Sequence, residues 1–303
     1  MYIDTHAHYN LPAFEDDRRE TFERMRGVGV SKIICPAITY ESNWQMMECL
    51  KGFENVYYAV GMHPKRVFPV RKDKRVERVV PHIAKLRDEY ESRAQVLAEL
   101  ESKLASIAEL ASNGERVVAV GEAGLDYSLN PGTLERKVQM AVFRAQVEIS
   151  LKAHLPLVLH VRDAHRDAMH ILHMYRTQFR GSAHCFCCGS NEAKEYLAMG
   201  FSLGIGGKVT YEQNAGLREA VAMAPLDRIL LETDAPYVLP AGFSGFGDKD
   251  AACAVPTGFA ARRNDSTAIP VIAAEVARLR GITVEEVAEV TTANAERVFF
   301  GGM

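Results

Sequence analysis

The sequence has few cysteines and no long apolar run. Six cysteines in 303 residues are too few for a disulfide scaffold. No segment approaches the roughly 18 consecutive apolar residues of a transmembrane helix, and the opening MYIDTHAHYN lacks the apolar core of a secretion signal. We therefore expect a cytoplasmic chain with reduced thiols and no membrane contact.

Neither sign of charge dominates the composition. The 36 basic and 39 acidic residues leave a formal net charge of -3, which excludes a global attraction to nucleic acid. Any contact with a polyanion has to be local. The adjacent Cys187 and Cys188 lack the CxxC spacing of a structural zinc site, and the chain shows no internal repeat and no sign of an obligate protein partner.

Short apolar segments rich in β-branched residues alternate with longer amphipathic segments along the whole chain. This alternation is typical of βα units with a parallel sheet, and eight strands are enough to close a barrel. The sequence therefore predicts a single (β/α)₈ TIM-barrel domain over residues 1–303. The expected strands are Tyr2–His6, Lys32–Ala37, Val56–Val60, Val117–Gly121, Pro156–His160, Ser182–Cys185, Phe201–Ile205 and Arg228–Glu232.

An amphipathic segment follows each of these strands. The expected helices are Glu15–Arg26, Ser42–Lys51, Val76–Ser112, Leu134–Lys152, His165–Gln178, Glu192–Met199, Asn214–Met223, Pro270–Arg280 and a final segment Glu285–Phe300. The third is too long and too charged for an ordinary barrel helix. We interpret residues 70–115 as a helical insertion, and the Gly-, Ala- and Pro-rich residues 237–262 as a long loop above one end of the barrel.

Residues that commonly bind metals recur where the predicted strands end. They are His6 and His8 at the end of the first strand, Glu122 at the end of the fourth, His160 and His184 at the ends of the fifth and sixth, and Asp234 just after the eighth. Polar side chains at the carboxyl ends of barrel strands point toward the catalytic mouth. The sequence therefore predicts that these six residues form one metal site.

The His-x-His spacing suits metal binding because residues i and i+2 of a strand face the same side. Alone, such a pair is a common accident of surfaces and cores, and Glu122 alone could form an ion pair inside the barrel. Together, four histidines and two carboxylates suit Zn²⁺, Mn²⁺, Fe²⁺ or Ni²⁺, and also Mg²⁺ when water completes the shell. A carboxylate offers two oxygens, so Glu122 is the natural bridge between two divalent ions.

The motifs DTHAH, GMHP, VGEAGLDY, LHVRDA, AHCF and LLETDAPY occur in this order, followed by RRND and TTANAERVF. This set resembles the TatD family of metal-dependent hydrolases, within the amidohydrolase-like barrels. The resemblance implies that His6, His8, Glu122 and Asp234 hold one metal, and that Glu122, His160 and His184 hold the other. It also implies hydrolysis of DNA phosphodiester bonds. Ser266 departs from the family pattern, which usually has proline there.

The residue types fit a two-metal hydrolysis in their own right. A metal-bound hydroxide would attack, both cations would stabilise charge on a phosphoryl oxygen, and Asp234 would be both ligand and general base. Glu122 and Asp234 are thus the predicted catalytic residues. An alternative role for Asp234 is the N-cap of a helix in the TDAPY turn.

Two further residues are candidate phosphate contacts. His63 ends the third strand and Arg162 follows His160 by two residues, so both could reach a substrate phosphate; the alternative is an ordinary rim residue. A basic stretch of Lys65, Arg66, Arg71, Lys72 and Lys74 could guide DNA or be a solvated loop. We interpret His82, His154, His165, His170 and His173 as surface residues.

Three functions remain open from sequence. The first is a deoxyribonuclease with two divalent metals (Mg²⁺, Mn²⁺ or Zn²⁺) and DNA as substrate. The second is an amidohydrolase-like enzyme acting on an amide, a lactone or a small phosphate ester, although Glu122 stands where a carboxylated lysine would be needed in one branch of those enzymes. The third is a non-catalytic barrel, against which the presence of all six ligands argues.

Overall fold

Eight parallel strands form one sheet in the computed structural model, which describes residues 1–67, 99–245 and 262–301. They are hydrogen-bonded in sequence order, and their apolar residues are buried on both faces, as expected of a parallel sheet. The strands are β1 (Tyr2–Asp4), β2 (Val30–Pro36), β3 (Val56–Val60), β4 (Val117–Asp126), β5 (Leu157–Arg162), β6 (Gly181–Ala183), β7 (Ser202–Ile205) and β8 (Ile229–Leu231).

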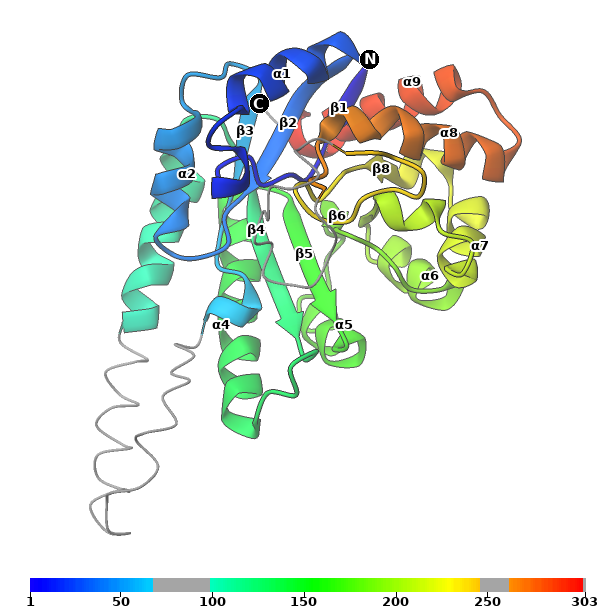
Figure 1. Cartoon of the computed structure of the whole chain (residues 1–303). Helices are drawn as coiled ribbons and strands as arrows, with labels where there is room; N and C mark the ends of the chain where they lie inside the picture. Colours follow the sequence, from blue (N-terminus) through cyan, green and yellow to red (C-terminus); the bar gives the residue numbers. More distant parts are fainter. Residues whose placement is uncertain (68–98, 246–261, 302–303) are drawn as a thin grey trace, which may run out of the picture.

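The sheet closes into a barrel between its first and last strands. The backbone N–H of Thr5 donates to the carbonyl of Leu231 at 3.0 Å, and Ala7 and Ala235 form a parallel bridge just beyond them. The predicted (β/α)₈ barrel is therefore confirmed. Because all strands run the same way, their carboxyl ends meet at one mouth, which lies at the bottom of Figure 1.

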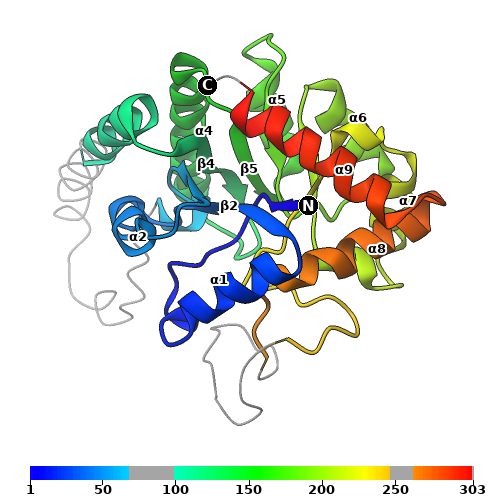
Figure 2. The same ribbon diagram turned by 90° about the horizontal axis from the view of Figure 1, so that it is seen from above.

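Helices surround the strands (Figures 1 and 2). They are α1 (Arg18–Gly27), α2 (Ser42–Leu50), α4 (Thr133–Ala153), α5 (His165–His173), α6 (Ser190–Ala198), α7 (Ala215–Met223), α8 (Ile269–Arg280) and α9 (Val284–Ala295). Residues 99–113 form a further helix beside α4, with Leu104, Ala108 and Ile149 lining the hollow between them. None of the described helices is long and apolar enough to cross a membrane.

The end of the barrel opposite the mouth is filled by the end of the chain. Val298 and Phe299 follow α9 and pack with Ile3, Val118 and Leu230 in one buried cluster. Figure 2 shows α9 lying across this end of the strands. Apolar packing therefore fixes the closed end of the barrel.

Several predicted boundaries are wrong. The fourth strand continues five residues past Gly121 to Asp126, so Glu122 lies within β4 and not after it. The fifth helix ends at His173 and not at Gln178, since Arg176 adopts a positive φ of 46° that an α-helix does not allow. Of the predicted insertion, residues 99–113 are helical, and 70–98 lie outside the described residues. Residues 246–261 of the predicted loop lie outside them as well.

Gly124 in β4 allows the backbones of β4 and β5 to approach closely beside His160. Gly124 pairs with His160 of β5, and a Cβ on Gly124 would lie 1.9 Å from the carbonyl oxygen of His160. Because two backbones would have to separate, we expect Gly124→Ala to lower the free energy of unfolding by about 1–3 kcal/mol, measured by urea denaturation. Gly52→Ala is the control, since nothing lies within 4 Å of its Cβ position. Equal stability of the two variants would contradict this account.

Candidate metal centre

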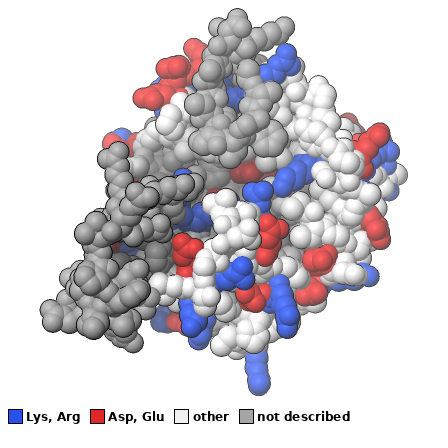
Figure 3. All heavy atoms as spheres, turned by 60° about the horizontal axis from the view of Figure 1, so that its bottom comes forward, with Lys and Arg blue, Asp and Glu red and all other residues white. Residues whose placement is uncertain are grey.

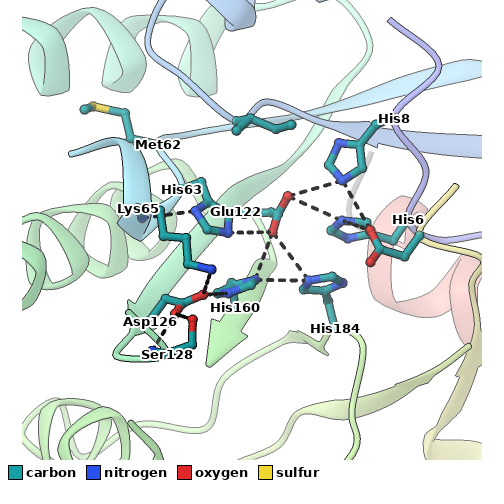
Figure 4. Close-up of polar contacts among 12 residues, drawn as sticks. His6, His8, Met62, His63, Lys65, Glu122, Asp126, Ser128, His160 and His184 are labelled. Atoms are coloured by element: carbon teal, nitrogen blue, oxygen red, sulfur yellow. Dashed lines mark hydrogen bonds and ion pairs between the residues drawn. The ribbon is translucent and has the colours of Figure 1, made fainter. Parts of the chain in front are cut away.

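The six predicted ligands converge at the mouth of the barrel. His6 and His8 follow β1, Glu122 lies in β4, His160 lies in β5, His184 follows β6 and Asp234 follows β8. The polar ends of the four histidines and Glu122 face one another (Figure 4). His6, His8, Glu122 and His184 are buried, with at most 8% of each residue exposed, so the group forms the floor of the mouth and not its rim.

The two carboxylate oxygens of Glu122 face two different sets of donors. Oε1 lies 3.5 Å from Nε2 of both His6 and His8. Oε2 lies 3.2 Å from Nδ1 of His160 and 3.4 Å from Nε2 of His184. Glu122 therefore stands between two groups of imidazoles, with one oxygen directed at each.

Asp234 completes the group on the His6 side. Its Oδ1 lies 3.3 Å from Nε2 of His8 and 3.8 Å from Nε2 of His6. The Asp234 N–H donates to the carbonyl of His6 at 2.8 Å, and its φ of 56° turns the chain there. No helix begins between residues 232 and 245, so the alternative role as a helix N-cap is wrong.

A buried hydrogen-bond network fixes the end of β1 that carries His6 and His8. Asp4 accepts from the hydroxyls of Thr233 at 2.6 Å and Ser266 at 2.5 Å, and from the backbone N–H groups of Thr233 and His6. Ser266 also contacts the Tyr9 hydroxyl at 2.8 Å. Ser266, which departs from the family pattern, thus supplies a hydroxyl that joins β1 to the segment before α8.

A second buried residue holds the turn that carries Asp234. The side-chain amide of Asn264 donates to the carbonyls of Thr233, Tyr237 and Val238, so it ties both sides of Asp234 together. Its neighbour Arg263 forms an ion pair with Asp17, whose Oδ2 lies 2.6 Å from the guanidinium. Two residues of the RRND motif therefore hold neighbouring segments in place: Asn264 fixes the turn of Asp234, and Arg263 binds Asp17 just before α1.

The electrostatics favour ionised carboxylates. Burial tends to raise the pKa of Glu122, but His6, His160 and His184 outweigh it and hold that pKa well below its usual range. Burial likewise opposes ionisation of Asp234, whose pKa is nevertheless lowered by His8 and His184. Both carboxyl groups are thus held in the charged form that binds cations.

The arrangement fits divalent metals. Each of the sets His6–His8–Glu122 and Glu122–His160–His184 offers three donor atoms within 4.8 Å of one another. Both ring nitrogens of His6 are buried without a hydrogen-bond partner among the described residues, which is costly unless another group occupies the space between the rings. Nitrogen and carboxylate donors together suit a borderline transition metal.

The two predicted substrate contacts occupy different positions. His63 lies beside the site: its ring centroid is 4.1 Å from that of His160, its Nε2 is 3.8 Å from Glu122, and burial, with a smaller effect of neighbouring His160, lowers its pKa to about 3. Arg162 is exposed at the end of β5. His63 is thus a neutral imidazole at the metal group, and Arg162 is a cation on the rim.

The remaining predictions on basic residues and histidines have mixed outcomes. Lys65 places its ammonium 3.1 Å from Asp126, and Arg66 follows it, whereas Arg71, Lys72 and Lys74 lie outside the described residues. His154, His170 and His173 are exposed as predicted. His165 is half-buried and pairs with Glu195 at 3.2 Å, and His82 is not among the described residues.

Two buried carboxylates beside the site were missed by the sequence reasoning. Asp126, at the end of β4, lies 3.0 Å from Nε2 of His160, and Glu232 lies 3.4 Å from Nδ1 of His184. Both occur in motifs already singled out, VGEAGLDY and LLETDAPY. Their position at strand ends was the available signal.

Comparison with known proteins agrees with this geometry. A family model described as TatD related DNase matches residues 3–300. The chain belongs to the TatD family of metal-dependent hydrolases. Apart from Tyr2, the match includes all eight strands of this TatD-family chain and all six predicted ligands.

Two curated relatives match nearly all of the chain. It is 30% identical over 300 residues to the uncharacterized metal-dependent hydrolase YabD of Bacillus subtilis, covering 99% of each chain. It is 32% identical over 290 residues to the 3'-5' ssDNA/RNA exonuclease TatD of Cronobacter sakazakii, covering 94% of this chain and 93% of the relative. The crystal structure of the TatD homolog YjjV from Escherichia coli superposes with a TM-score of 0.74 at 26% identity, covering 98% of this chain and 97% of that one.

Proposed function

We propose that this protein is a two-metal phosphodiesterase that cleaves single-stranded DNA, with Glu122 bridging the two metals. The observation that carries the proposal is the position of the Glu122 carboxylate, whose Oε1 faces His6 and His8 and whose Oε2 faces His160 and His184. A single metal would leave one of these buried sets without a cation. Two metals that share one carboxylate satisfy both sets.

His6, His8, Glu122 and Asp234 would hold one ion, and Glu122, His160 and His184 the other. Divalent cations bound there would supply Lewis-acid activation of water and stabilisation of negative charge on a phosphoryl oxygen. Asp234 is 16% exposed at its side chain and faces the mouth beside His8, so its carboxylate can accept the proton of an attacking water. His63, neutral and adjacent to Glu122, can contact a phosphate oxygen without repelling the metals.

A relative and the residues at the rim of the mouth support single-stranded DNA as the proposed substrate. The Cronobacter sakazakii relative is named a 3'-5' ssDNA/RNA exonuclease, and it spans nearly the same length as this chain. On the face that includes the mouth, the described residues carry Lys and Arg interspersed with Asp and Glu (Figure 3), so these residues form no broad basic surface for duplex DNA. A few local cations around the mouth suit a strand end better.

Arg162 is the clearest cation to test as a phosphate contact. If Arg162 neutralises one phosphate, Arg162→Ala should raise KM for a single-stranded oligonucleotide and leave kcat nearly unchanged. The slope of log(kcat/KM) against log salt concentration should become shallower by about 0.7. Arg166→Ala on α5 is the matched control, since Arg166 is also exposed and lies four residues away. Identical slopes in both variants would remove Arg162 from the binding surface.

The proposed function is tested by reconstitution. Purified protein is stripped of metal, restored separately with Mg²⁺, Mn²⁺ or Zn²⁺, and offered single-stranded DNA, duplex DNA, RNA, a simple phosphodiester and a panel of lactones and amides. We expect cleavage of single-stranded DNA only after metal is restored. Turnover confined to a lactone or an amide would overturn the proposal and favour an amidohydrolase-like activity.

A further inference from the structure

The two histidines of the His160–His184 side each have a carboxylate on the ring nitrogen that faces away from Glu122. His160 directs Nδ1 at Glu122, and its Nε2 lies 3.0 Å from Oδ2 of Asp126. His184 directs Nε2 at Glu122, and its Nδ1 lies 3.4 Å from Oε1 of Glu232. The pattern is the same although the two rings use opposite nitrogens, and Figure 4 shows it for His160.

Both carboxylates are buried and held in place by hydrogen bonds from neighbouring residues. Asp126 is 2% exposed and also accepts from the backbone N–H and hydroxyl of Ser128, at 2.9 and 2.6 Å. Glu232 is fully buried and accepts from the N–H of Cys185 at 2.5 Å. A Cβ at Gly204 of β7 would lie 2.2 Å from Oε2 of Glu232, so the barrel has space for this carboxylate only because that residue is glycine.

The burial of Glu232 calls for a positive partner. It has no ion pair with a Lys or Arg among the described residues; its ion-pair contact there is with His184. A buried carboxylate is costly unless a donor or a positive charge compensates it. Nδ1 of His184 lies 3.4 Å from Oε1 and is itself buried without a hydrogen-bond partner in the described part of the chain. An N–H there would compensate the carboxylate and would leave the lone pair of Nε2 for a metal ion on the Glu122 side.

We infer that Asp126 and Glu232 are positioning residues, which fix the tautomer and ring orientation of His160 and His184 so that each would offer the lone pair of its other nitrogen to a metal ion shared with Glu122. A carboxylate beside one imidazole nitrogen keeps a proton there and raises the basicity of the other. This inference rests on the metal centre of the proposed function. It assigns His160 the Nε2–H form and His184 the Nδ1–H form.

The other pair of histidines lacks such a carboxylate. The ion-pair contacts of His6 and His8 among the described residues all involve Nε2, and Nδ1 of each is buried without a hydrogen-bond partner there. Loss of Asp126 or Glu232 should therefore weaken one metal position and leave the other nearly unchanged. Asp126 is itself close enough to His63 and His160 to be a direct ligand, but the ammonium of Lys65 already lies 3.1 Å from its Oδ2.

The experiment uses calorimetric titration of Mn²⁺ or Zn²⁺ into the stripped full-length protein. Asp126→Ala and Glu232→Ala should each lower the affinity of one of two sites by about 10–100-fold. Asp126→Asn and Glu232→Gln, which keep a carbonyl acceptor, should recover most of it. Glu195→Ala, which removes the carboxylate from His165, is the matched control and should change neither site. Equal weakening of both sites, or of neither, overturns the inference.

A second measurement reads the tautomers directly, with Zn²⁺ bound and without substrate. Long-range ¹H–¹⁵N correlation spectra of the histidine-labelled, Zn²⁺-loaded protein should show His160 protonated at Nε2 and His184 protonated at Nδ1, with each preference weakened in the corresponding alanine variant. The opposite tautomers in the wild type would overturn the inference. A wild-type protein that binds metal and has these tautomers, but cleaves no DNA, would refute only the proposed function. Three sites in the wild type and two in Asp126→Ala would make Asp126 a ligand and overturn its positioning role.

Discussion

Glu122→Ala should abolish DNA cleavage and most metal binding together. The residue supplies one oxygen to each set of histidines, so its removal takes a ligand from both metals at once. It also leaves four imidazoles facing one another without the anion that stabilises a nearby positive charge. We expect kcat/KM to fall on the order of 10³-fold or more. Metal analysis after dialysis should fall from two ions per chain to fewer than one.

Two variants make this result interpretable. Glu115 is an exposed carboxylate two residues before β4 begins, at the end of the strand away from the mouth. Glu115→Ala should leave both activity and metal content unchanged. Glu122→Gln keeps the volume and one carbonyl oxygen, so we expect it to retain the fold and one metal while losing most activity. Full metal content and activity in Glu122→Ala would show that the carboxylate is not a bridge.

Asp234→Asn should separate catalysis from binding. The amide keeps an oxygen near His8 but cannot accept a proton from water. We expect kcat to fall by about 10²–10⁴-fold, the range for loss of a general base, with KM for a single-stranded oligonucleotide changed much less. The measurement is steady-state kinetics at saturating metal, so that any weakened ion is restored by mass action.

The control for Asp234 is an aspartate at the far end of the same strand. Asp227 is exposed just before β8, and Asp227→Asn should retain full kcat. If Asp234→Asn lowers kcat only in proportion to its metal occupancy, Asp234 is a ligand and no more. If kcat stays low when both metals are bound, the role in proton transfer stands.

The barrel and the convergence of the six residues could be predicted because each depends on a local pattern. Apolar β-branched segments followed by amphipathic segments define βα units, and parallel strands bring their carboxyl ends to one mouth. His6 and Asp234 are 228 positions apart, yet both are placed by the rule that strand ends meet. Glu122 was identified for the same reason, although β4 proved to run four residues beyond it.

Features that depend on side-chain contacts across strands could not be predicted. The VGEAGLDY motif presents both Glu122 and Asp126, and only the register with β5 shows that Asp126 reaches the outer nitrogen of His160. Ser266 appeared as a departure from a family pattern, whereas in the structure its hydroxyl bonds to Asp4. A sequence pattern gives the face and end of a strand but not its polar partners.

The link between Asp4 and Ser266 has a consequence for the synthesis of the protein. The residue that anchors the first two histidines finds its hydroxyl partner 262 positions later in the chain, and Asn264 fastens the turn of Asp234 from the same late segment. Domains fold as their residues leave the ribosome. A nascent chain that ends before this segment therefore lacks a formed mouth, and the enzyme cannot act until residues 264–266 have been translated.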